Sequence, residues 1–312
     1  MPFTAKSGKF NASINTVEFG TGDKAVKIGG ENVFPLYSFD AAIENAPKVG
    51  IEITDFGMEH EPECIKKYYE GCATLADMAR KAASMEGVDF LSFRMEGGDP
   101  NGANKSTEEL IGELKEIADA VDLPLVVCGC KNVEKDAELF SKAAEALNGK
   151  NAVILSAKEE NYKTVGAAAG LAYKQIVGAE SAVDINLAKQ LNVLISQLGV
   201  DSKSVVMNVG TAAVGYGFEY VISTMDRVKA AALQQGDANL QMPIITPVAE
   251  EAWNVKEAMA SEDDMPEWGN QEERGIGMEV STAASVLACG SNAVILKHPT
   301  SVATISKLIK EM

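Results

Sequence analysis

The sequence predicts a (β/α)8 barrel, the TIM-barrel fold of the α/β class, with a β-hairpin extension at its N-terminus. After residue 48, short apolar runs alternate with helical patterns eight times. The runs are β-branched and nearly continuous, which is typical of parallel strands buried on both faces. A doubly wound open sheet follows the same alternation, but the count of eight favours the barrel. The expected strands are 49–56, 88–94, 123–130, 151–157, 174–179, 204–210, 242–248 and 292–298.

The segments between these runs carry helix signals. Ser106 begins a capping-box pattern that is followed by a stripe of apolar residues at helical spacing. The range 181–184 opens a second clear helix, which Gly199 closes. For the last helix of the chain, Thr300 or Ser301 is the expected cap.

Residues 1–48 precede the repeat and form the expected extension, which packs on the barrel formed by residues 49–312. Between residues 10 and 38, alternating runs surround the glycines at 20–23 and 29–30, and this pattern predicts one or two hairpins. Such hairpins would most simply plug the N-terminal end of the barrel.

The stretch at about 249–275, after the seventh expected strand, is a long acidic insert. It holds nine Asp and Glu residues together with Trp253 and Trp268, both tryptophans of the chain. Loops of this length are uncommon unless they bind something or are disordered. On the face where barrels carry their sites, the insert suggests a docking surface, and a solvated excursion with one helix at 250–260 is the alternative.

The composition excludes several classes of function. The chain has 312 residues with 46% hydrophobic residues, enough for one large α/β domain or two ordinary ones. A formal net charge of −17 would repel a phosphate backbone, so nucleic-acid binding is not expected. The first residues, MPFTAKSGKF, do not resemble a signal peptide, and no apolar run is long enough to span a bilayer. Five widely spaced cysteines do not suggest a disulfide framework, and the expected location is the reducing cytoplasm, with no membrane partner.

Two cysteines, Cys128 and Cys130, end the third expected strand and, being two residues apart, are expected on the same face. A structural zinc or an iron–sulfur cluster needs about four ligands, and the other three cysteines are expected on helices away from this strand. The pair also lacks the C-x-x-C spacing of a redox motif. We therefore interpret both thiols as core residues at the end of a strand and expect no metal site.

The expected C-terminal ends of the strands offer polar groups without an evident acid–base apparatus. The loop at 94–102 is rich in glycine but has no nucleotide-binding pattern, and the loop at 208–217 contains small residues. The seventh and eighth loops, where barrels usually bind phosphate, are acidic or contain His298, which disfavours a phosphorylated substrate. No GxSxG turn supports a serine hydrolase. These features predict a wide, uncharged mouth lined by amides and hydroxyls.

Several stretches resemble a known family. The N-terminal hairpin region and the sequences VGIEITDF, FRMEGGDPNG, PLVVCGCKN and MNVGTAAVGYGFEY are similar to the small subunit of the corrinoid iron–sulfur protein. In other nomenclature, this family is the delta subunit of the acetyl-CoA decarbonylase/synthase complex. The likeness covers essentially the whole chain, including the insert with its two tryptophans.

The resemblance implies a (β/α)8 barrel related to pterin-dependent methyltransferase barrels. Such a subunit forms a heterodimer with a large subunit that carries a [4Fe-4S] cluster and a corrinoid domain, and the corrinoid lies between that domain and the barrel mouth. The cobalt accepts a methyl group from methyltetrahydrofolate through a separate methyltransferase and delivers it to acetyl-CoA synthase in the reductive acetyl-CoA pathway. A reductive activator is a further partner. No catalytic activity of the subunit alone is expected.

Residues at the C-terminal ends of the expected strands are candidates for contact with the corrinoid, because the corrin is flat and rimmed by amide groups. We assign no catalytic residue and no metal ligand. The candidate contacts are Arg94, Asn101, Lys131, Asn132, Asn208, Thr211, Thr246 and His298.

Two other functions remain open. A pterin-dependent methyltransferase acting alone would contact a methylated pterin through Asp55, Asp99 or Asn208. A metal-dependent aldolase or hydrolase would use His60 and His298 with nearby carboxylates, although two histidines in separate loops give it little support. A carrier subunit should lose corrinoid when its partner is removed, a methyltransferase should bind methyltetrahydrofolate alone, and a metalloenzyme should contain stoichiometric metal.

Overall fold

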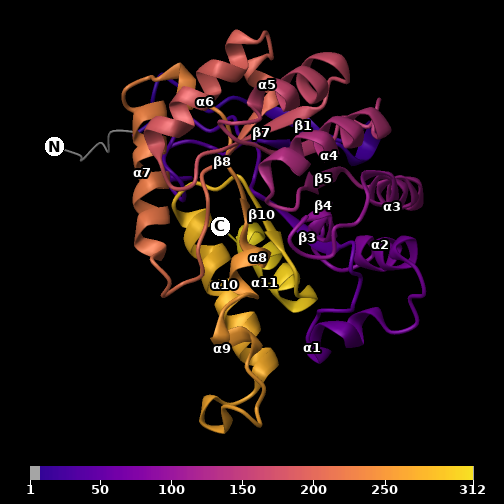
Figure 1. The fold of residues 1–312 in the computed structure, drawn as a ribbon. Coiled ribbons are helices and arrows are strands. Elements are labelled where there is room, and N and C mark those ends of the chain that lie inside the picture. Colours follow the sequence, from indigo (N-terminus) through magenta and orange to yellow (C-terminus); the bar gives the residue numbers. More distant parts are fainter. Residues whose placement is uncertain (1–7, 312) are drawn as a thin grey trace, which may run out of the picture.

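The computed structural model describes residues 8–311 and contains an eight-stranded parallel barrel surrounded by helices (Figure 1). Hydrogen bonds join the strands in the order β8-β7-β6-β5-β4-β3-β10-β9, and a single bridge between Met207 and Ile244 closes the ring. The predicted fold class and all eight predicted strands are confirmed. The strands are β3 (Lys48–Thr54), β4 (Phe90–Arg94), β5 (Leu125–Cys128), β6 (Val153–Ala157), β7 (Ile176–Glu180), β8 (Val205–Asn208), β9 (Ile245–Pro247) and β10 (Ala293–Leu296).

Helices follow the strands and cover the outside of the barrel. Ser106 caps its helix by accepting a hydrogen bond from the backbone N–H of Glu109 at 3.1 Å. The last helix begins at Pro299, so the prediction of a cap at Thr300 or Ser301 is wrong and His298 occupies the cap position. The α-helices are α1 (Glu63–Lys66), α2 (Leu75–Ala83), α3 (Thr107–Ala120), α4 (Val133–Ala146), α5 (Tyr162–Val165), α6 (Ile185–Gln197), α7 (Phe218–Leu233), α8 (Val248–Ala252), α9 (Lys256–Met259), α10 (Gln271–Ala288) and α11 (Pro299–Glu311).

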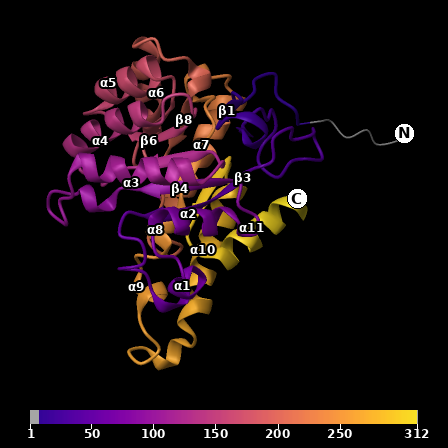
Figure 2. The same ribbon diagram turned by 90° about the vertical axis from the view of Figure 1, so that its right-hand side faces the viewer.

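The N-terminal hairpin fills one end of the barrel. Strands β1 (Val17–Phe19) and β2 (Val26–Ile28) pair antiparallel, and their apolar side chains share a buried cluster with residues at the starts of the barrel strands. The rings of Phe19 and Phe90 meet edge to face with their centroids 5.5 Å apart. Because Phe90 is the first residue of β4, the hairpin closes the N-terminal end. Figure 2 shows the insert around α9 extending away from this end of the molecule.

Gly50 makes room for this plug, since the strand register sets it opposite Phe90. A Cβ atom at Gly50 would lie 2.1 Å from Cε2 of Phe90, whose ring is held by Phe19. We expect Gly50→Ala to lower the free energy of unfolding by about 1–3 kcal/mol through overpacking. Denaturant unfolding would measure this change, and a second substitution, Phe90→Leu, should recover part of it. Gly112→Ala on the open face of α3 is the matched control and should be neutral or stabilising.

Candidate functional site

Strand alternation decides which side chains enter the barrel. Along β3, Ile51 and Ile53 pack against the helices, so Glu52 points into the lumen between them. By the same alternation, Arg94 at the end of β4 and Cys128 at the end of β5 point inward near the C-terminal end. The mouth therefore has a charged floor.

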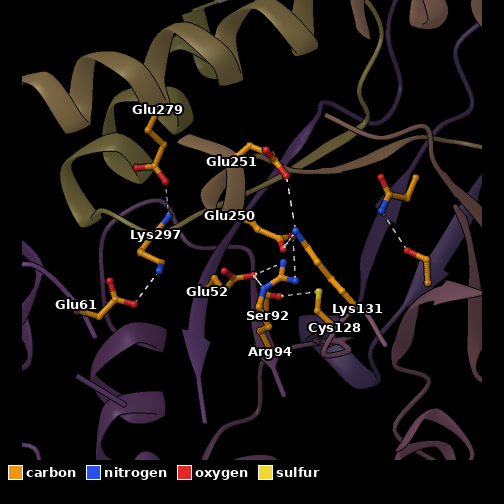
Figure 3. Close-up of polar contacts among 12 residues, drawn as sticks. Glu52, Glu61, Ser92, Arg94, Cys128, Lys131, Glu250, Glu251, Glu279 and Lys297 are labelled. Atoms are coloured by element: carbon orange, nitrogen blue, oxygen red, sulfur yellow. Dashed lines mark hydrogen bonds and ion pairs between the residues drawn. The ribbon is translucent and has the colours of Figure 1, made fainter. Parts of the chain in front are cut away.

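Arg94 is the centre of an ion network at this floor (Figure 3). Its Nη2 lies 3.0 Å from Oε2 of Glu52, and its Nη1 lies 3.0 Å from Oε2 of Glu250. Burial alone would lower the pKa of Arg94, but the two carboxylates outweigh it and raise the pKa well above its ordinary value. The guanidinium thus stays charged and ties β3 and β4 to α8.

Lys131 continues the network on the exposed side of the mouth. Its Nζ forms an ion pair with Glu250 and lies 3.8 Å from Oε1 of Glu251. Burial would raise the pKa of Glu250, but Arg94 and Lys131 hold it below its ordinary value. The prediction of an uncharged mouth is wrong, because carboxylates from within a strand and from α8 pair with the cations at the strand ends.

The mouth encloses a cavity of about 230 Å³ at the C-terminal ends of β4 to β9. Lys158 and Glu180 form an ion pair of 3.3 Å at its wall, and the side-chain amide of Asn208 donates to the hydroxyl of Ser156 at 3.1 Å. Four of the candidate contact residues lie together around this cavity: Arg94, Lys131, Asn208 and Thr211.

The structure does not bring the other four candidates to the cavity. Asn101 is exposed in the loop after β4, and Asn132 caps α4 by accepting from the N–H of Lys135 at 3.0 Å. Thr246 points to the opposite side of β9 from Ile245, and its hydroxyl lies 2.8 Å from that of Ser291. The fourth residue, His298, is buried.

His298 has a structural environment. Its Nδ1 accepts a hydrogen bond from the N–H of Thr300 at 3.1 Å, so the ring proton of the neutral form is on Nε2, which lies 3.3 Å from Oε1 of Glu272. The ring stacks on Trp253 at 5.8 Å and meets Tyr68 edge to face at 5.2 Å. Trp253 is only 3% exposed, so it cannot belong to a docking surface as the sequence suggested.

Burial lowers the pKa of His298 despite the nearby carboxylate of Glu272. A histidine with a depressed folded-state pKa stabilises the fold above its unfolded pKa of about 6.5, and this contribution is lost as the pH falls toward the folded value. We expect the stability of the wild type to fall more steeply from pH 7 to 5 than that of His298→Asn, which keeps a cap acceptor. Urea unfolding across this pH range measures the difference, and parallel curves would contradict the prediction.

The remaining tryptophan lies in an insert with many internal contacts. Arg274 donates to the backbone carbonyls of Glu257 at 2.6 Å and Ala260 at 2.7 Å. The ring of Trp268 lies under two cations, with Nζ of Lys256 at 5.3 Å and the guanidinium of Arg274 at 5.7 Å. The insert is therefore a fixed arm beside the mouth, and it contains two short helices, α8 and α9, where the alternative of a solvated excursion had one helix at 250–260.

Cys128 and Cys130 do not form a pair. Cys128 lies in the barrel interior, with its Sγ 3.6 Å from the hydroxyl of Ser92, whereas Cys130 packs in the outer core beneath the helices. The expectation that they share a face is wrong because β5 ends at Cys128 and the chain turns at Lys131, where φ is +70°. Burial raises the pKa of each thiol to about 12. Within residues 8–311, no group of three His, Cys, Asp or Glu is placed to hold a metal ion.

Two residues considered for a pterin have other partners. Asp55 accepts the N–H of Gly97 at 2.9 Å and forms an ion pair of 3.0 Å with Lys105. Asp99 accepts the N–H of Asn101 at 3.0 Å within its own loop. Both carboxylates thus stabilise the loop after β4.

The sequence reasoning missed three residues that form ion pairs at the C-terminal end of the barrel. Glu52 interrupts an apolar strand, and a charged residue in such a run signals a buried ion pair. Lys297 follows β10 and pairs with Glu61 at 2.7 Å. For Glu250, which looked like one more carboxylate of the acidic insert, no such signal exists.

Among residues 8–311, no helix is long and apolar enough to cross a membrane.

Comparison with known proteins now adds the family. Residues 16–298 match the family model described as "CO dehydrogenase/acetyl-CoA synthase delta subunit". The chain belongs to this delta-subunit family. It is 30% identical over 299 residues to acetyl-CoA decarbonylase/synthase complex subunit delta 1 of Methanosarcina thermophila, an alignment that covers 94% of this chain and 67% of that protein.

A second delta subunit has a similar sequence identity to this chain. The delta subunit of Methanopyrus kandleri is 33% identical over 94% of this chain and 72% of its own length. Among solved structures, a dihydropteroate synthase from Coxiella burnetii in complex with pteroic acid aligns with a TM-score of 0.54 at 12% identity, covering 89% of this chain and 98% of the other. The synthase of Thermus thermophilus aligns with a TM-score of 0.52 at 13% identity, covering 95% of this chain and 99% of the other. At such low identity the likeness shows the barrel fold alone.

Proposed function

We propose that this delta-family chain is the small subunit of a heterodimeric corrinoid iron–sulfur methyl carrier. Its barrel mouth would cover a corrinoid held by the large subunit, which would also carry the [4Fe-4S] cluster. The methyl group would come from methyltetrahydrofolate through a separate methyltransferase and pass to acetyl-CoA synthase in the reductive acetyl-CoA pathway. A place in the acetyl-CoA decarbonylase/synthase complex is supported by the names of the related delta subunits.

The observation that carries the proposal is the shape of the mouth. The ion network between Arg94, Glu250 and Lys131 fills the opening and leaves a cavity of about 230 Å³. Pockets that enclose a drug-sized ligand measure about 300–1,000 Å³. A corrin is larger than such ligands, so it would lie across the rim of the mouth rather than inside it.

The residues at the rim suit a flat, amide-bearing ligand. The side chain of Lys131 is 58% exposed, and Asn208 and Thr211 line the cavity beside it. When bound, the corrinoid supplies the nucleophilic cobalt, and the protein supplies binding and access. Lys131, Asn208 and Thr211 would orient its edge, while the network beneath them would exclude water from the covered face.

An iron–sulfur cluster fits this chain less well than a corrinoid does. Cys128 and Cys130 lie in different cores, and their buried thiols have raised pKa values that disfavour the thiolate ligands a cluster needs. The proposal therefore assigns the cluster to the large subunit. An autonomous pterin methyltransferase has less support, because the carboxylate of Asp55 is already bound by Lys105 and Gly97.

Visible absorption spectra test the proposal. The chain is purified alone and with its large subunit, each is given corrinoid under reducing conditions, and the bound corrinoid is measured after gel filtration. We expect corrinoid to remain only with the pair. Binding of methyltetrahydrofolate by the chain alone, with no corrinoid retained by the pair, would overturn the carrier function.

A matched pair of variants locates the contact. Thr211→Trp places a bulky ring at the mouth, and Thr21→Trp makes the same change in an exposed loop at the plugged end. Each variant should co-purify with the large subunit and keep the circular dichroism spectrum of the wild type. Thr211→Trp should retain much less corrinoid than the wild type, whereas Thr21→Trp should match it. Equal retention by the two variants would place the corrinoid away from the mouth.

A further inference from the structure

The chain contains two Asn-Gly pairs, Asn101-Gly102 and Asn148-Gly149, and both lie in exposed loops. In such a pair, the backbone nitrogen of the glycine can attack the side-chain carbonyl carbon of the asparagine, because glycine has no side chain to block the approach. The bond from that carbon to the amide nitrogen then breaks, ammonia leaves, and a succinimide ring remains. The two pairs have the same sequence, so the fold around them decides which one reacts.

Hydrogen bonds hold both reacting groups of the first pair. The N–H of Gly102 donates to the carbonyl of Asp99 at 2.9 Å, and the side-chain amide of Asn101 donates to Oδ1 of Asp99 at 3.3 Å. The glycine nitrogen must lose its proton to attack, and the Asp99 carbonyl holds that proton. Both groups would have to leave their partners before the ring could close, so the loop after β4 protects Asn101.

The second pair follows α4 and has neither restraint. The side chain of Asn148 and the N–H of Gly149 make no hydrogen bond within residues 8–311. Gly149 has a φ of +84°, and a Cβ atom built on it would have no neighbour within 4 Å, so the backbone has room to turn toward the Asn148 side chain. Residues 148–150 are all exposed, so water reaches the ring once it forms.

We propose that Asn148 is a site of spontaneous deamidation, and that its modification loosens the hairpin plug of the barrel. The Gly149 nitrogen closes the succinimide and expels ammonia, and water then opens the ring to aspartate or isoaspartate. The whole reaction consumes one water, releases one ammonia and replaces a neutral amide with a carboxylate. This new negative charge lies just beyond the C-terminal end of α4, where the helix dipole disfavours an anion.

The link to the hairpin runs through the next residue. A backbone hydrogen bond of 2.9 Å closes the turn at 147–150. Directly after this turn, the carbonyl of Asn151 accepts from the N–H of Gly20 at 2.7 Å, and its side-chain amide donates to the carbonyl of Glu18 at 2.9 Å. Isoaspartate adds a methylene group to the backbone inside the turn, so it should displace Asn151 and weaken its hold on the hairpin.

Peptide mass mapping of the full chain tests the site. The protein is incubated at mildly alkaline pH, either folded or unfolded in urea, and conversion at each asparagine is followed over time. In the folded chain, Asn148 should convert about tenfold faster than Asn101, whose hydrogen bonds must first break. In urea, the two should convert at similar rates. Asn148→Gln, which closes the ring poorly, should abolish conversion at 148 and leave Asn101 unchanged.

The product distinguishes the mechanism and its consequence. Isoaspartate at position 148 is the signature of the succinimide, so equal rates in the folded chain, faster conversion of Asn101, or aspartate as the sole product would overturn the site. Asn148→Asp is the matched control for the hairpin, because it supplies the charge without the extra methylene. Amide hydrogen exchange in β1 and β2 should be faster in the isoaspartate form than in this variant, and equal exchange would overturn the link to the hairpin.

Discussion

Lys229→Met is expected to lower the free energy of unfolding by about 3–5 kcal/mol, the effect of leaving a buried carboxylate without its cation. The Lys229 Nζ lies 2.7 Å from Oε1 of Glu31 and 3.0 Å from Oδ1 of Asn292, and both charged side chains are buried. These contacts join α7 to the segment after the hairpin and to the start of β10. The variant leaves the buried Glu31 carboxyl with the side-chain amide of Asn292 but without its cation, and denaturant unfolding at pH 7 measures the loss.

The pH dependence of this deficit is a second measurement on the same variant. Burial would raise the pKa of Glu31, but Lys229 and Asn292 hold it below its ordinary value. In the wild type, the contribution of the pair is present above the unfolded pKa and lost as the pH falls through the folded one. In Lys229→Met, burial dominates and the carboxyl is protonated more readily, so the deficit should shrink at acidic pH.

Lys27→Met is the matched control, because Lys27 forms an exposed ion pair of 3.3 Å with Glu18 on the hairpin. Its effect should be much smaller than that of Lys229→Met, since solvent screens exposed pairs. The double variant Glu31→Gln/Lys229→Met removes both charges and should recover part of the stability. Equal effects of the two lysine substitutions would show that Glu31 does not need its buried partner.

Arg94→Met should have an effect of similar size, about 3–5 kcal/mol, at the other end of the barrel. Glu52, whose side chain is 1% exposed, would lose the hydrogen bond that it accepts from Nε and its ion pair with Nη2, and Glu250 would keep only Lys131. Because Glu250 is on α8, faster amide hydrogen exchange in that helix should accompany the loss of stability. Calorimetry and exchange measured by mass spectrometry check the two effects.

Two comparisons sharpen this prediction. Arg80→Met makes the same substitution in an exposed pair with Asp77 on α2 and should change stability very little. Arg94→Lys keeps the charge but cannot reach both carboxylates with a planar fork, so its stability should lie between those of Arg94→Met and the wild type. A small effect of Arg94→Met with unchanged exchange in α8 would contradict the assigned role.

The barrel could be predicted from the sequence because strands buried on both faces are apolar along most of their length, as in the run AVIL of β10. The site was harder, because one residue of register decides which way a side chain points. Thr246 was expected at the mouth, but it faces outward while its neighbours Ile245 and Pro247 face the lumen. Arg94 was correctly expected at a strand end, yet its partner Glu250 comes from the distant insert, and such pairing leaves no local pattern.

His298 shows a second limit of sequence reasoning. A histidine that ends the last strand suggests a ligand contact, and the side chain instead caps α11 because that helix begins at Pro299. Helix boundaries are uncertain by one or two residues when they are inferred from capping signals. At this position, that uncertainty separates a binding residue from a structural one.

The fixed arm beside the mouth affects the entropy of any association that uses it. Ordering a flexible loop on binding opposes affinity, and a loop that is already ordered avoids that loss. In the insert, Arg274 holds two backbone carbonyls and the ring of Trp268 lies under two cations, so its conformation is set before a partner arrives. A partner that docks on this arm would therefore lose less entropy on binding, because the surface that it contacts is already folded.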